Sequence, residues 1–365
     1  MPLTPDDTAR YARHLSLAGF GAAAQESLKA ASVLVIGAGG LGCPALLYLA
    51  AAGVGRIVIV DPDTVDRSNL QRQVLYTDAD IGRYKAEVAA ARLSALNPLI
   101  RTEAVVARFA RDNALGLVRG CDLVLDGSDN FETRYLVNDA CVIAGRPFIY
   151  GAIQGFEGHV SVFNLKGGPT YRCLFPEPPA PGTVPNCAEA GVLGAVTGMI
   201  GAAQACEAIK VLSGVGESLS GRLLIWDALS MTASSVRLRR DPVASAVTEL
   251  PAAGYGATCA APDHDLEVDV PALRRLLASG APVQLLDVRE GWEREMGSIE
   301  PSFHMPLRFL EACALSDLAP MDPSVHTVVY CAAGVRSLRG IGLLRERLGF
   351  RSAVSLRGGI KAWAP

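Results

Sequence analysis

The sequence predicts two α/β domains, the first built on a mostly parallel, doubly wound sheet and the second smaller. Three observations support this prediction. The chain has 365 residues, whereas a single domain usually has roughly 100–200 residues. Short apolar runs alternate with helical patterns in the first part of the chain, which is typical of strand–helix–strand units. After a stretch without periodicity, the same alternation begins again.

The composition is that of an ordinary globular protein. Half of the residues are apolar and 19% are charged, which excludes a disordered chain or a collagen-like fibre. The net charge of −3 provides no basic surface for nucleic acid or a membrane, so neither is expected as a partner. The nine cysteines are scattered, and residues 1–13 have no apolar segment of a signal peptide. We therefore expect reduced thiols and a cytoplasmic location.

The first domain is expected over residues 1–240. A helical N-terminal stretch precedes two apolar runs, 33–36 and 56–60, which indicate strands buried on both faces around a Gly-rich turn and a helix. The further elements expected, in order, are a helix over 82–96, strands over 122–126 and 147–150, an antiparallel strand over 158–165, a buried apolar helix over 191–212 and a strand over 222–226.

The second domain is expected over residues 266–365, after a linker at 241–265 that lacks periodicity. Asp269 and Pro271 mark the start of a helix, as N-cap and first-turn proline. Strands are expected at 283–288 and 327–330, each followed by helical sequence. This pattern indicates a small α/β domain of about 100 residues.

A glycine-rich turn joins the first predicted strand to the helix after it. Its G-x-G-x-x-G motif has glycines at Gly37, Gly39, Gly40 and Gly42, and such a turn lets the backbone approach phosphate oxygens at a helix N-terminus. Asp61 ends the next strand, where an acid binds ribose hydroxyls in Rossmann-like domains. The motif predicts a nucleotide site and by itself leaves a dehydrogenase as the alternative.

The loop after Asp61 favours a triphosphate over a dinucleotide. Arg72 lies in this loop, Lys85 begins the next helix and Asp129 follows a later strand. Arg72 and Lys85 can neutralise a triphosphate, and Asp129 can hold Mg²⁺. The other candidate nucleotide-binding residues are Asp63, Ser68, Asn69, Gln73 and Asn130.

These segments resemble the ubiquitin-activating-like enzymes of the ThiF/MoeB type, which adenylate small sulfur-carrier proteins. The resemblance covers about Arg10 to Asp227 and rests on VLVIGAGGLGCPALLYLAAAGVG, DPDTVDRSNLQRQVLY, IGRYKAE and DGSDNFETRYLVND. It implies a Gly-Gly-ended, ubiquitin-like sulfur carrier as partner and a homodimer in which Arg13 reaches the ATP of the partner subunit. The implied ATP site is lined by Gly40, Asp61, Asn69, Arg72, Lys85, Asp129 and Asn130.

Adenylation at such a site needs charge balance rather than a general base. A C-terminal carboxylate is already a nucleophile, so it can attack the α-phosphorus while pyrophosphate leaves. Cys187 ends a Pro-rich loop before an apolar helix, a position that favours a reactive thiolate able to attack the acyl adenylate. An inert loop thiol is the alternative, and the resemblance supports a transient acyl-enzyme or acyl-disulfide.

The resemblance also bears on zinc. Many relatives carry two Cys-x2-Cys pairs, which supply the four ligands of a tetrahedral zinc site. In this chain the first pair reads Thr170-Tyr171-Arg172-Cys173, and the stretch 243–247, where the second pair is expected, has no cysteine. We therefore expect no structural zinc and an ordinary thiol at Cys173.

The second domain carries a candidate sulfur site. Cys331 directly follows a predicted strand and precedes a helix, so N–H groups and the helix dipole can stabilise an anionic sulfur, with Arg336 adding a positive charge. Cysteine phosphatases use Cys-x5-Arg, whereas the shorter Cys-x4-Arg spacing here suits a persulfide. Together with LLDVREGWEREMGSIEPSFHMPL and LRGGIKAW, the motif resembles rhodaneses over about 268–365. Ala332 and Ala333 stand where rhodaneses more often have a charged residue.

The two domains together predict a single reaction sequence. The first activates the carrier's terminal glycine with ATP and Mg²⁺, and the second delivers persulfide sulfur from Cys331, charged by a donor such as a cysteine desulfurase. Two other functions remain open. One is an activator of a carrier for conjugation, with the second domain as a non-catalytic interaction module. The other is an NAD-dependent dehydrogenase, for which the sequence offers no acid/base for hydride transfer.

Overall fold

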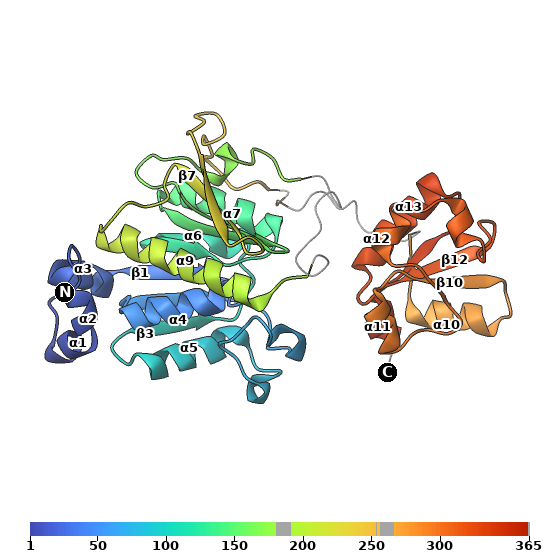
Figure 1. Cartoon of the computed structure of the whole chain (residues 1–365), viewed down its shortest axis with the longest axis horizontal. Helices are drawn as coiled ribbons and strands as arrows, with labels where there is room; N and C mark the ends of the chain where they lie inside the picture. The colour runs from blue at the N-terminus through green and yellow to red at the C-terminus, as the bar shows by residue number, and fades with distance from the viewer. Residues whose placement is uncertain (180–190, 253, 256–265, 364–365) are drawn as a thin grey trace. The chain divides into compact units, whose positions relative to one another are not determined.

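The computed structural model describes residues 1–179, 191–252, 254–255 and 266–363 (Figure 1). The chain divides into two compact units, residues 1–257 and 258–365, each with its own sheet. The predicted α/β class is therefore confirmed. The expected linker at 241–265 needs correction, because Leu250 and Tyr255 are buried in a hydrophobic cluster of the first unit. The apolar side chains of this segment hold its described part on the first unit.

An eight-stranded sheet forms the centre of the first unit, in the order β3-β2-β1-β4-β5-β6-β7-β8. The strands from β3 to β5 in this order pair in parallel, and those from β5 to β8 pair antiparallel. The strands are β1 (Ser32–Ile36), β2 (Arg56–Val60), β3 (Arg101–Val105), β4 (Leu123–Asp126), β5 (Phe148–Gln154), β6 (Glu157–Phe163), β7 (Arg222–Asp227) and β8 (Thr232–Arg237). From β1 the sheet is extended on one side by β2 and β3 and on the other side by β4 and β5. Open α/β sheets bind ligands at such a switch in strand order, which here lies between β1 and β4.

Helices cover both faces of this sheet. The described helices are α1 (Pro5–Arg10), α2 (Ala12–Leu15), α3 (Gly21–Ala30), α4 (Gly42–Ala52), α5 (Lys85–Leu96), α6 (Arg111–Arg119), α7 (Phe131–Ala144) and α9 (Gly194–Ser213), with short 3-10 turns η1 (Arg67–Asn69), η2 (Asp78–Asp80) and η3 (Tyr171–Cys173). Helices α4, α5 and α9 cover one face, and α6 and α7 cover the other (Figure 1).

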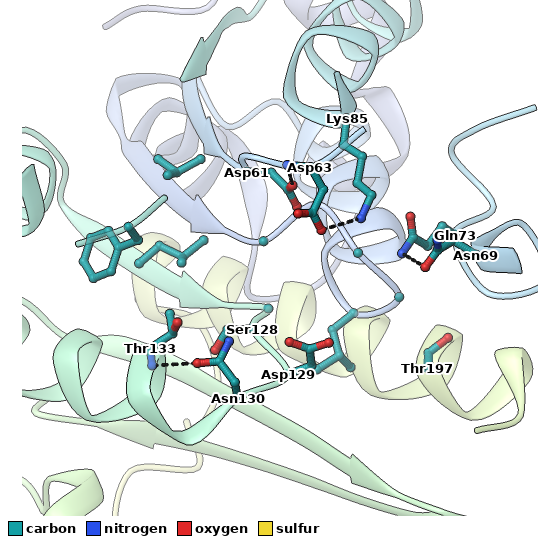
Figure 2. Close-up of a pocket in the computed structure, with 18 of the residues that line it drawn as sticks. Asp61, Asp63, Asn69, Gln73, Lys85, Ser128, Asp129, Asn130, Thr133 and Thr197 are labelled. Carbon is teal, nitrogen blue, oxygen red and sulfur yellow. Dashed lines mark hydrogen bonds and ion pairs between the residues drawn. The ribbon is translucent and has the colours of Figure 1, made fainter. Parts of the chain in front are cut away.

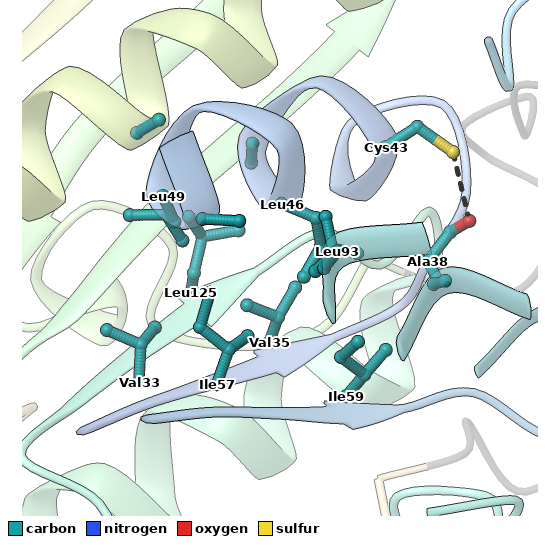
Figure 3. Close-up of a cluster of buried hydrophobic side chains, with 14 of the residues drawn as sticks. Val33, Val35, Ala38, Cys43, Leu46, Leu49, Ile57, Ile59, Leu93 and Leu125 are labelled. Carbon is teal, nitrogen blue, oxygen red and sulfur yellow. Dashed lines mark hydrogen bonds between the residues drawn. The ribbon is translucent and has the colours of Figure 1, made fainter. Parts of the chain in front are cut away.

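The core explains the apolar runs of the central strands. On one face, Val33 and Val35 of β1 lie in a cluster with Leu46 and Leu49 of α4 (Figure 3). The intervening Leu34 belongs to the cluster on the opposite face. Because alternate side chains of β1 enter two different cores, the strand is apolar along its length.

The helix α9 is long and apolar enough to cross a membrane by length and composition alone. It packs against α4, β5 and β6, and Ala205 and Ala208 lie in the core of the first unit. Gln204 of this helix donates a hydrogen bond from Nε2 to the carbonyl oxygen of Asp126, at 2.7 Å. The expectation of a buried core helix is confirmed.

The helix expected over 82–96 begins later, at Lys85. Gly82 has a φ of +85°, which lies outside the right-handed helical region. Tyr84 at the N-cap is extended. Lys85 is therefore the first residue of α5, which places its side chain beside the loop that follows β2.

The second unit is a five-stranded parallel sheet in the order β11-β10-β12-β13-β9. Its helix α10 begins as predicted, with Asp269 accepting a hydrogen bond from the backbone N–H of Ala272. The elements are β9 (Glu267–Val268), α10 (Val270–Ala278), β10 (Val283–Asp287), α11 (Gly291–Glu295), β11 (Phe303–His304), α12 (Leu307–Leu310), η5 (Leu315–Leu318), β12 (His326–Tyr330), α13 (Val335–Arg347), β13 (Val354–Leu356) and α14 (Gly359–Trp363).

Candidate active site

The turn between β1 and α4 requires glycine at two positions. A Cβ atom on Gly37, whose φ is +90°, would lie 2.8 Å from the carbonyl oxygen of Gly127. A Cβ atom on Gly42 would lie 2.0 Å from the carbonyl oxygen of Gly37. The glycines thus allow the turn to pack against the end of β4, and the backbone N–H of Ala38 donates to Asp61 Oδ2 at 2.7 Å.

A cavity of about 410 Å³ lies beside this turn, at the carboxyl ends of β1, β2 and β4 (Figure 2). Most of the predicted nucleotide-binding residues line it, namely Gly37, Gly39, Gly40, Asp61, Asp63, Asn69, Arg72, Gln73, Lys85, Asp129 and Asn130. Gly42 does not line it and serves the packing of the turn. Ser68 does not line it either, because its hydroxyl donates to Asp66.

Several lining residues were not predicted from the sequence. Arg108 and Phe109 follow β3. The sequence did not predict them, because β3 mixes charged and apolar residues and was not predicted as a strand. Arg134 extends from α7 and donates from Nη2 to the carbonyl oxygen of Ser128 at 3.3 Å. Thr197 comes from the apolar helix α9, where nothing in the sequence distinguishes it from its neighbours.

Lys85 and Asp63 form an ion pair in the cavity wall (Figure 2), with Lys85 Nζ 2.9 Å from Asp63 Oδ2. The Lys85 side chain is only 6% exposed, whereas that of Asp63 is 64% exposed. A buried ammonium group needs an anionic partner. Because Asp63 is free to turn towards solvent, phosphate oxygens can replace it beside Lys85.

Asp61 joins two loops from a buried position. Its Oδ2 accepts from the backbone N–H of Ala38 and its Oδ1 from that of Asp63, at 2.8 Å. Burial raises the pKa of Asp61, against the opposing effects of Lys85 and the two backbone N–H groups. Each carboxylate oxygen keeps a second lone pair, which suits a ribose hydroxyl.

Three further polar side chains of the cavity lining, those of Asn69, Arg72 and Gln73, come from the loop that follows β2. Asn69 Oδ1 accepts from Arg72 Nη2 at 2.9 Å and from Gln73 Nε2 at 3.1 Å. Gln73 Oε1 is buried and has no hydrogen-bond partner within the described part of the chain. A buried acceptor without a partner is costly, so a hydroxyl or amino donor of a ligand fits here.

Asp129 and Asn130 lie exposed after β4. Asn130 Oδ1 caps α7 by accepting from the backbone N–H of Thr133 at 2.9 Å. Over the described ranges, no group of three or more His, Cys, Asp or Glu side chains is arranged to hold a metal ion. At phosphate sites Mg²⁺ is usually held by one or two carboxylates together with phosphate oxygens, and Asp129 offers one such carboxylate.

Arg13 and Cys187 are the remaining residues predicted for the first unit. Arg13 lies exposed on α2 and does not line the cavity of its own chain. Its neighbour His14 bonds through Nδ1 to Gln25 Oε1 at 3.0 Å, in keeping with a packing role. Cys187 lies outside the described residues.

Cys173 is the one cysteine left of the first Cys-x2-Cys pair that the resemblance led us to expect. Ser245, from the stretch expected to carry the second cysteine pair, places its Oγ 3.2 Å from the Cys173 sulfur. The backbone N–H groups of Thr170 and Asp241 donate to the same sulfur at 3.2 and 3.3 Å. Burial acts to raise the pKa of Cys173, but these hydrogen bonds outweigh it and hold the pKa below its usual value. The expectation of an ordinary thiol is therefore incomplete.

Cys331 begins the loop between β12 and α13 and is nearly buried, with 2% exposure. The backbone N–H of Gly334 donates to its sulfur at 3.1 Å. The loop carbonyls are held elsewhere, since Cys331 O accepts from Ile360 N and Ala332 O accepts from Lys361 N at the start of α14. With its carbonyls held in this way, the loop keeps an N–H for an anionic sulfur.

The sequence predicts that Arg336 adds a positive charge beside Cys331, but in the structure an acidic side chain pairs with this charge. Both terminal nitrogens of Arg336 pair with the carboxylate of Glu293 on α11, each at 2.6 Å. The hydrogen bonds to Glu293 raise the pKa of Arg336, and Cys331 adds a smaller electrostatic effect in the same direction. The positive charge near the sulfur is therefore largely balanced, and the loop residues Ala332 and Ala333 add none.

Comparison with known proteins identifies both units. The ThiF family model matches residues 11–246, and the rhodanese-like domain model matches residues 269–365. The adenylyltransferase/sulfurtransferase MoeZ of Mycobacterium tuberculosis is 45% identical over 99% of this chain and 94% of its own length. The sulfur carrier protein adenylyltransferase of Thermus thermophilus is 54% identical over 66% of this chain and 91% of its own.

A solved structure supports the fold of the first unit. The crystal structure of E. coli MccB with MccA-N7isoASN aligns with a TM-score of 0.59 at 24% identity, covering 66% of this chain and 74% of that one. At that identity the likeness concerns the fold alone. The family resemblance read from the motifs is confirmed by the two domain models and by the relative that matches nearly the whole chain. This chain belongs to the ThiF family of adenylating enzymes and carries a C-terminal rhodanese-like domain.

Proposed function

We propose that the first unit adenylates the C-terminal glycine of a ubiquitin-like sulfur carrier, and that the second unit supplies sulfur as a persulfide on Cys331. One observation supports this most directly: the cavity places the Gly37–Gly42 turn, Lys85, Arg72 and Asp129 around one space. This is the donor and charge set that ATP needs. Two relatives, an adenylyltransferase/sulfurtransferase and a sulfur carrier protein adenylyltransferase, have names that agree with both halves of the proposal.

Adenylation follows from the charges around the cavity. ATP would lie with its phosphates against the glycine turn and the N-terminus of α4. Its phosphate oxygens would displace Asp63 from Lys85, and Arg72 would bind the outgoing pyrophosphate. Asp129 would hold Mg²⁺ against the phosphates. The carrier's terminal carboxylate attacks the α-phosphorus, forming an acyl adenylate as pyrophosphate leaves.

Sulfur transfer uses the persulfide of Cys331. Its outer sulfur attacks the acyl carbonyl, a carbon–sulfur bond forms and AMP leaves. A second thiolate then attacks the Cys331 sulfur, which releases the carrier thiocarboxylate and leaves a protein disulfide for an external thiol to reduce. Cys187, outside the described residues, remains our candidate for a thiol that attacks the acyl adenylate and forms a transient acyl-enzyme or acyl-disulfide.

We further propose a cytoplasmic homodimer that receives sulfur from a protein persulfide such as that of a cysteine desulfurase. The dimer accounts for Arg13, whose charge lies on the surface of α2 rather than in the cavity of its own chain. The donor class is suggested by the loop after Cys331. Its only cation, Arg336, is already paired with Glu293, so the loop offers little to a small dianion such as thiosulfate.

The test is ATP–pyrophosphate exchange, with and without a Gly-Gly-ended carrier, followed by mass analysis of the carrier. Wild-type protein should exchange pyrophosphate and, given a persulfide donor, convert the carrier to its thiocarboxylate. Cys331→Ala should keep the exchange and lose the product. Full thiocarboxylate yield from Cys331→Ala would contradict the two-unit scheme. Absence of exchange with every carrier tested would contradict adenylation.

The same experiment decides between the proposal and the two alternatives left open by the sequence. A conjugating activator with a non-catalytic second unit would exchange pyrophosphate but never form a persulfide on Cys331. The N–H of Gly334 on the Cys331 sulfur argues against that alternative. A dehydrogenase would give no exchange at all.

A further inference from the structure

Two buried hydroxyl groups form a hydrogen-bonded pair, one member of which lies next to the Cys331 sulfur. Ser337, in the first turn of α13, and Ser355, on β13, are both fully buried. Their oxygens are 2.8 Å apart, and Ser337 Oγ is 3.6 Å from the Cys331 sulfur. Ser337 Oγ is also 2.8 Å from the carbonyl oxygen of Gly334, and Ser355 Oγ is 3.4 Å from that same oxygen.

The number of hydroxyl protons limits how this cluster is bonded. Ser337 has one proton and can give it either to the Gly334 carbonyl or to the Cys331 sulfur. The Gly334 carbonyl already accepts the backbone N–H of Leu338, so losing the Ser337 proton does not leave it unpaired. Ser355 can then donate to Ser337 Oγ or to Gly334 O. The two hydroxyl groups thus have two protons to donate. When the sulfur is anionic, it can accept the proton of Ser337, and Ser337 Oγ can accept the proton of Ser355.

We propose that Ser355 is a positioning residue that makes the Ser337 hydroxyl available to the Cys331 sulfur. When the sulfur is neutral, Ser337 donates to Gly334 O. When Cys331 is a thiolate, Ser337 turns to the sulfur while Ser355 donates to the Ser337 oxygen, so no buried hydroxyl is left unsatisfied. A donor that is itself a hydrogen-bond acceptor is strengthened, because chains of hydrogen bonds polarise one another.

The charged side chains near the loop do not by themselves account for stabilisation of a Cys331 thiolate. Arg336 interacts electrostatically with Cys331, and the carboxylate of Glu293 balances the charge of Arg336. The other hydrogen-bond donor at the sulfur is the N–H of Gly334. A neutral hydroxyl pair therefore supplies stabilisation that the paired arginine does not.

The hydroxyls act in the step that charges the cysteine. The Cys331 thiolate attacks the outer sulfur of a donor persulfide, a new sulfur–sulfur bond forms at Cys331, and the donor leaves as a thiolate. The inference rests on the proposed role of Cys331 as the sulfur acceptor. Its test is chosen to separate the hydroxyl pair from that role.

The experiment measures the rate at which iodoacetamide alkylates Cys331 in the full-length chain from pH 5 to 10, by mass analysis of the peptide that contains Cys331. Ser337→Ala and Ser355→Ala should each move the midpoint of the profile upward by about one pH unit, with about tenfold slower alkylation below the midpoint. The double variant should move it no further than a single one, because the two hydroxyls act as one chain.

Matched variants separate the hydroxyl from packing. Ser355→Thr and Ser355→Val add nearly the same volume to β13 and differ in the hydroxyl, so the threonine should keep the wild-type midpoint and the valine should not. Ser352→Ala removes a nearby hydroxyl that bonds instead to Val325 O, and it should change nothing.

The outcomes also separate this inference from the proposed function. Formation of a Cys331 persulfide from a small alkyl persulfide is measured in the same variants. If wild-type Cys331 takes up no sulfur, the proposed function fails and the inference with it. If wild-type Cys331 takes up sulfur but Ser355→Thr and Ser355→Val give the same midpoint, or the double variant shifts additively, the hydroxyl pair alone is disproved.

Discussion

The charged residues of the nucleotide cavity are held in place before any ligand binds. Lys85 is fixed by its position as the first residue of α5 and by the burial of its side chain. Asp61 joins the glycine turn to the loop after β2 through two backbone hydrogen bonds. Donors that need not reorganise during the reaction are the ones that stabilise a transition state most.

We predict that Lys85→Met abolishes most of the ATP–pyrophosphate exchange. Methionine keeps the apolar length of the side chain in its buried position but removes the charge that faces the phosphates, so kcat should fall by about 10²–10³-fold. Initial rates of exchange at saturating carrier measure this effect.

The matched control is Arg83→Met, two residues before Lys85. Arg83 is 60% exposed, pairs with Asp80 and does not line the cavity. Its rate should stay within twofold of wild type. Equal losses in the two variants would show that general charge near the cavity matters, and not the ammonium group of Lys85.

At the level of single residues, the sequence predicted most of the polar side chains that line the cavity but not the partners with which charged side chains pair. Arg72, Lys85 and Asp129 follow parallel strands or begin a helix, so the topology places them at one edge. The pairing of Arg336 with Glu293 was not predictable, because the two residues lie 43 positions apart and only the folded loop brings them together.

At the level of elements, the sulfur loop depends on the helix that follows β13. Helix α14 begins at Gly359, and the N–H groups of Ile360 and Lys361 bind the carbonyls of Cys331 and Ala332. A Cβ atom on Gly359 would lie 2.3 Å from the Cys331 carbonyl oxygen, and the φ of Gly359 is +61°. The loop and α14 therefore fit only when this position is a glycine.

We predict that Gly359→Ala abolishes persulfide formation on Cys331 and leaves ATP–pyrophosphate exchange at the wild-type rate. The clash with the Cys331 carbonyl must displace the sulfur loop, whereas the nucleotide cavity is in the other unit. Mass analysis after incubation with a persulfide donor measures the first effect, and exchange kinetics measure the second.

Gly349→Ala provides the control for this prediction. Gly349 has a similarly positive φ of +81° but nothing within 4 Å of its Cβ position. Its substitution should cost about 1–2 kcal/mol of stability through backbone strain and still allow persulfide formation. Loss of persulfide in both variants would mean that destabilisation of the unit, and not the local clash, stops the reaction.

The polar cluster around Cys173 leads to a prediction about metal. Thr170 Oγ1, the Cys173 sulfur and Ser245 Oγ lie together at 3.2 to 3.5 Å from one another. One thiol and two hydroxyls are a poor ligand set for Zn²⁺, which prefers four Cys or His ligands in structural sites. Elemental analysis of protein purified without chelator should give far less than one zinc per chain. A content close to one would show that the ligands lie elsewhere.

Strands buried on both faces were predictable from the sequence, whereas the helices α6 and α7 and the short or mixed strands were not predicted. The central strands are buried on both faces, so their sequences are apolar runs. The start of α10 was predictable from its N-cap residue Asp269. Strand β3 mixes charged and apolar residues, and every residue of β8 is exposed. Strands β9, β11 and β13 have only two or three residues, too few for any periodicity to show.

At the scale of the whole molecule, one chain joins two units with separate cores and separate chemistry. The described apolar residues cluster within the first unit or within the second. The buried Leu250 and Tyr255 extend the first unit into the segment expected as a linker. Because the reaction centres belong to different units, variants of one should not alter the isolated reaction of the other.

The homodimer proposal gives the last prediction, which concerns Arg13. Arg13→Ala should lower adenylation by about 10²-fold or more if its guanidinium balances phosphate charge in the transition state. A single variant does not reveal which chain receives that charge, so Arg13→Ala protein is mixed with Lys85→Met protein after reversible dissociation. In a mixed dimer, the intact cavity of the Arg13→Ala chain receives Arg13 from the partner subunit. With equal mixing, half of the dimers are mixed and each has one complete site, so about a quarter of wild-type exchange should return. If Arg13 acts within its own chain, no combination restores a complete site and the mixture stays as inactive as its components.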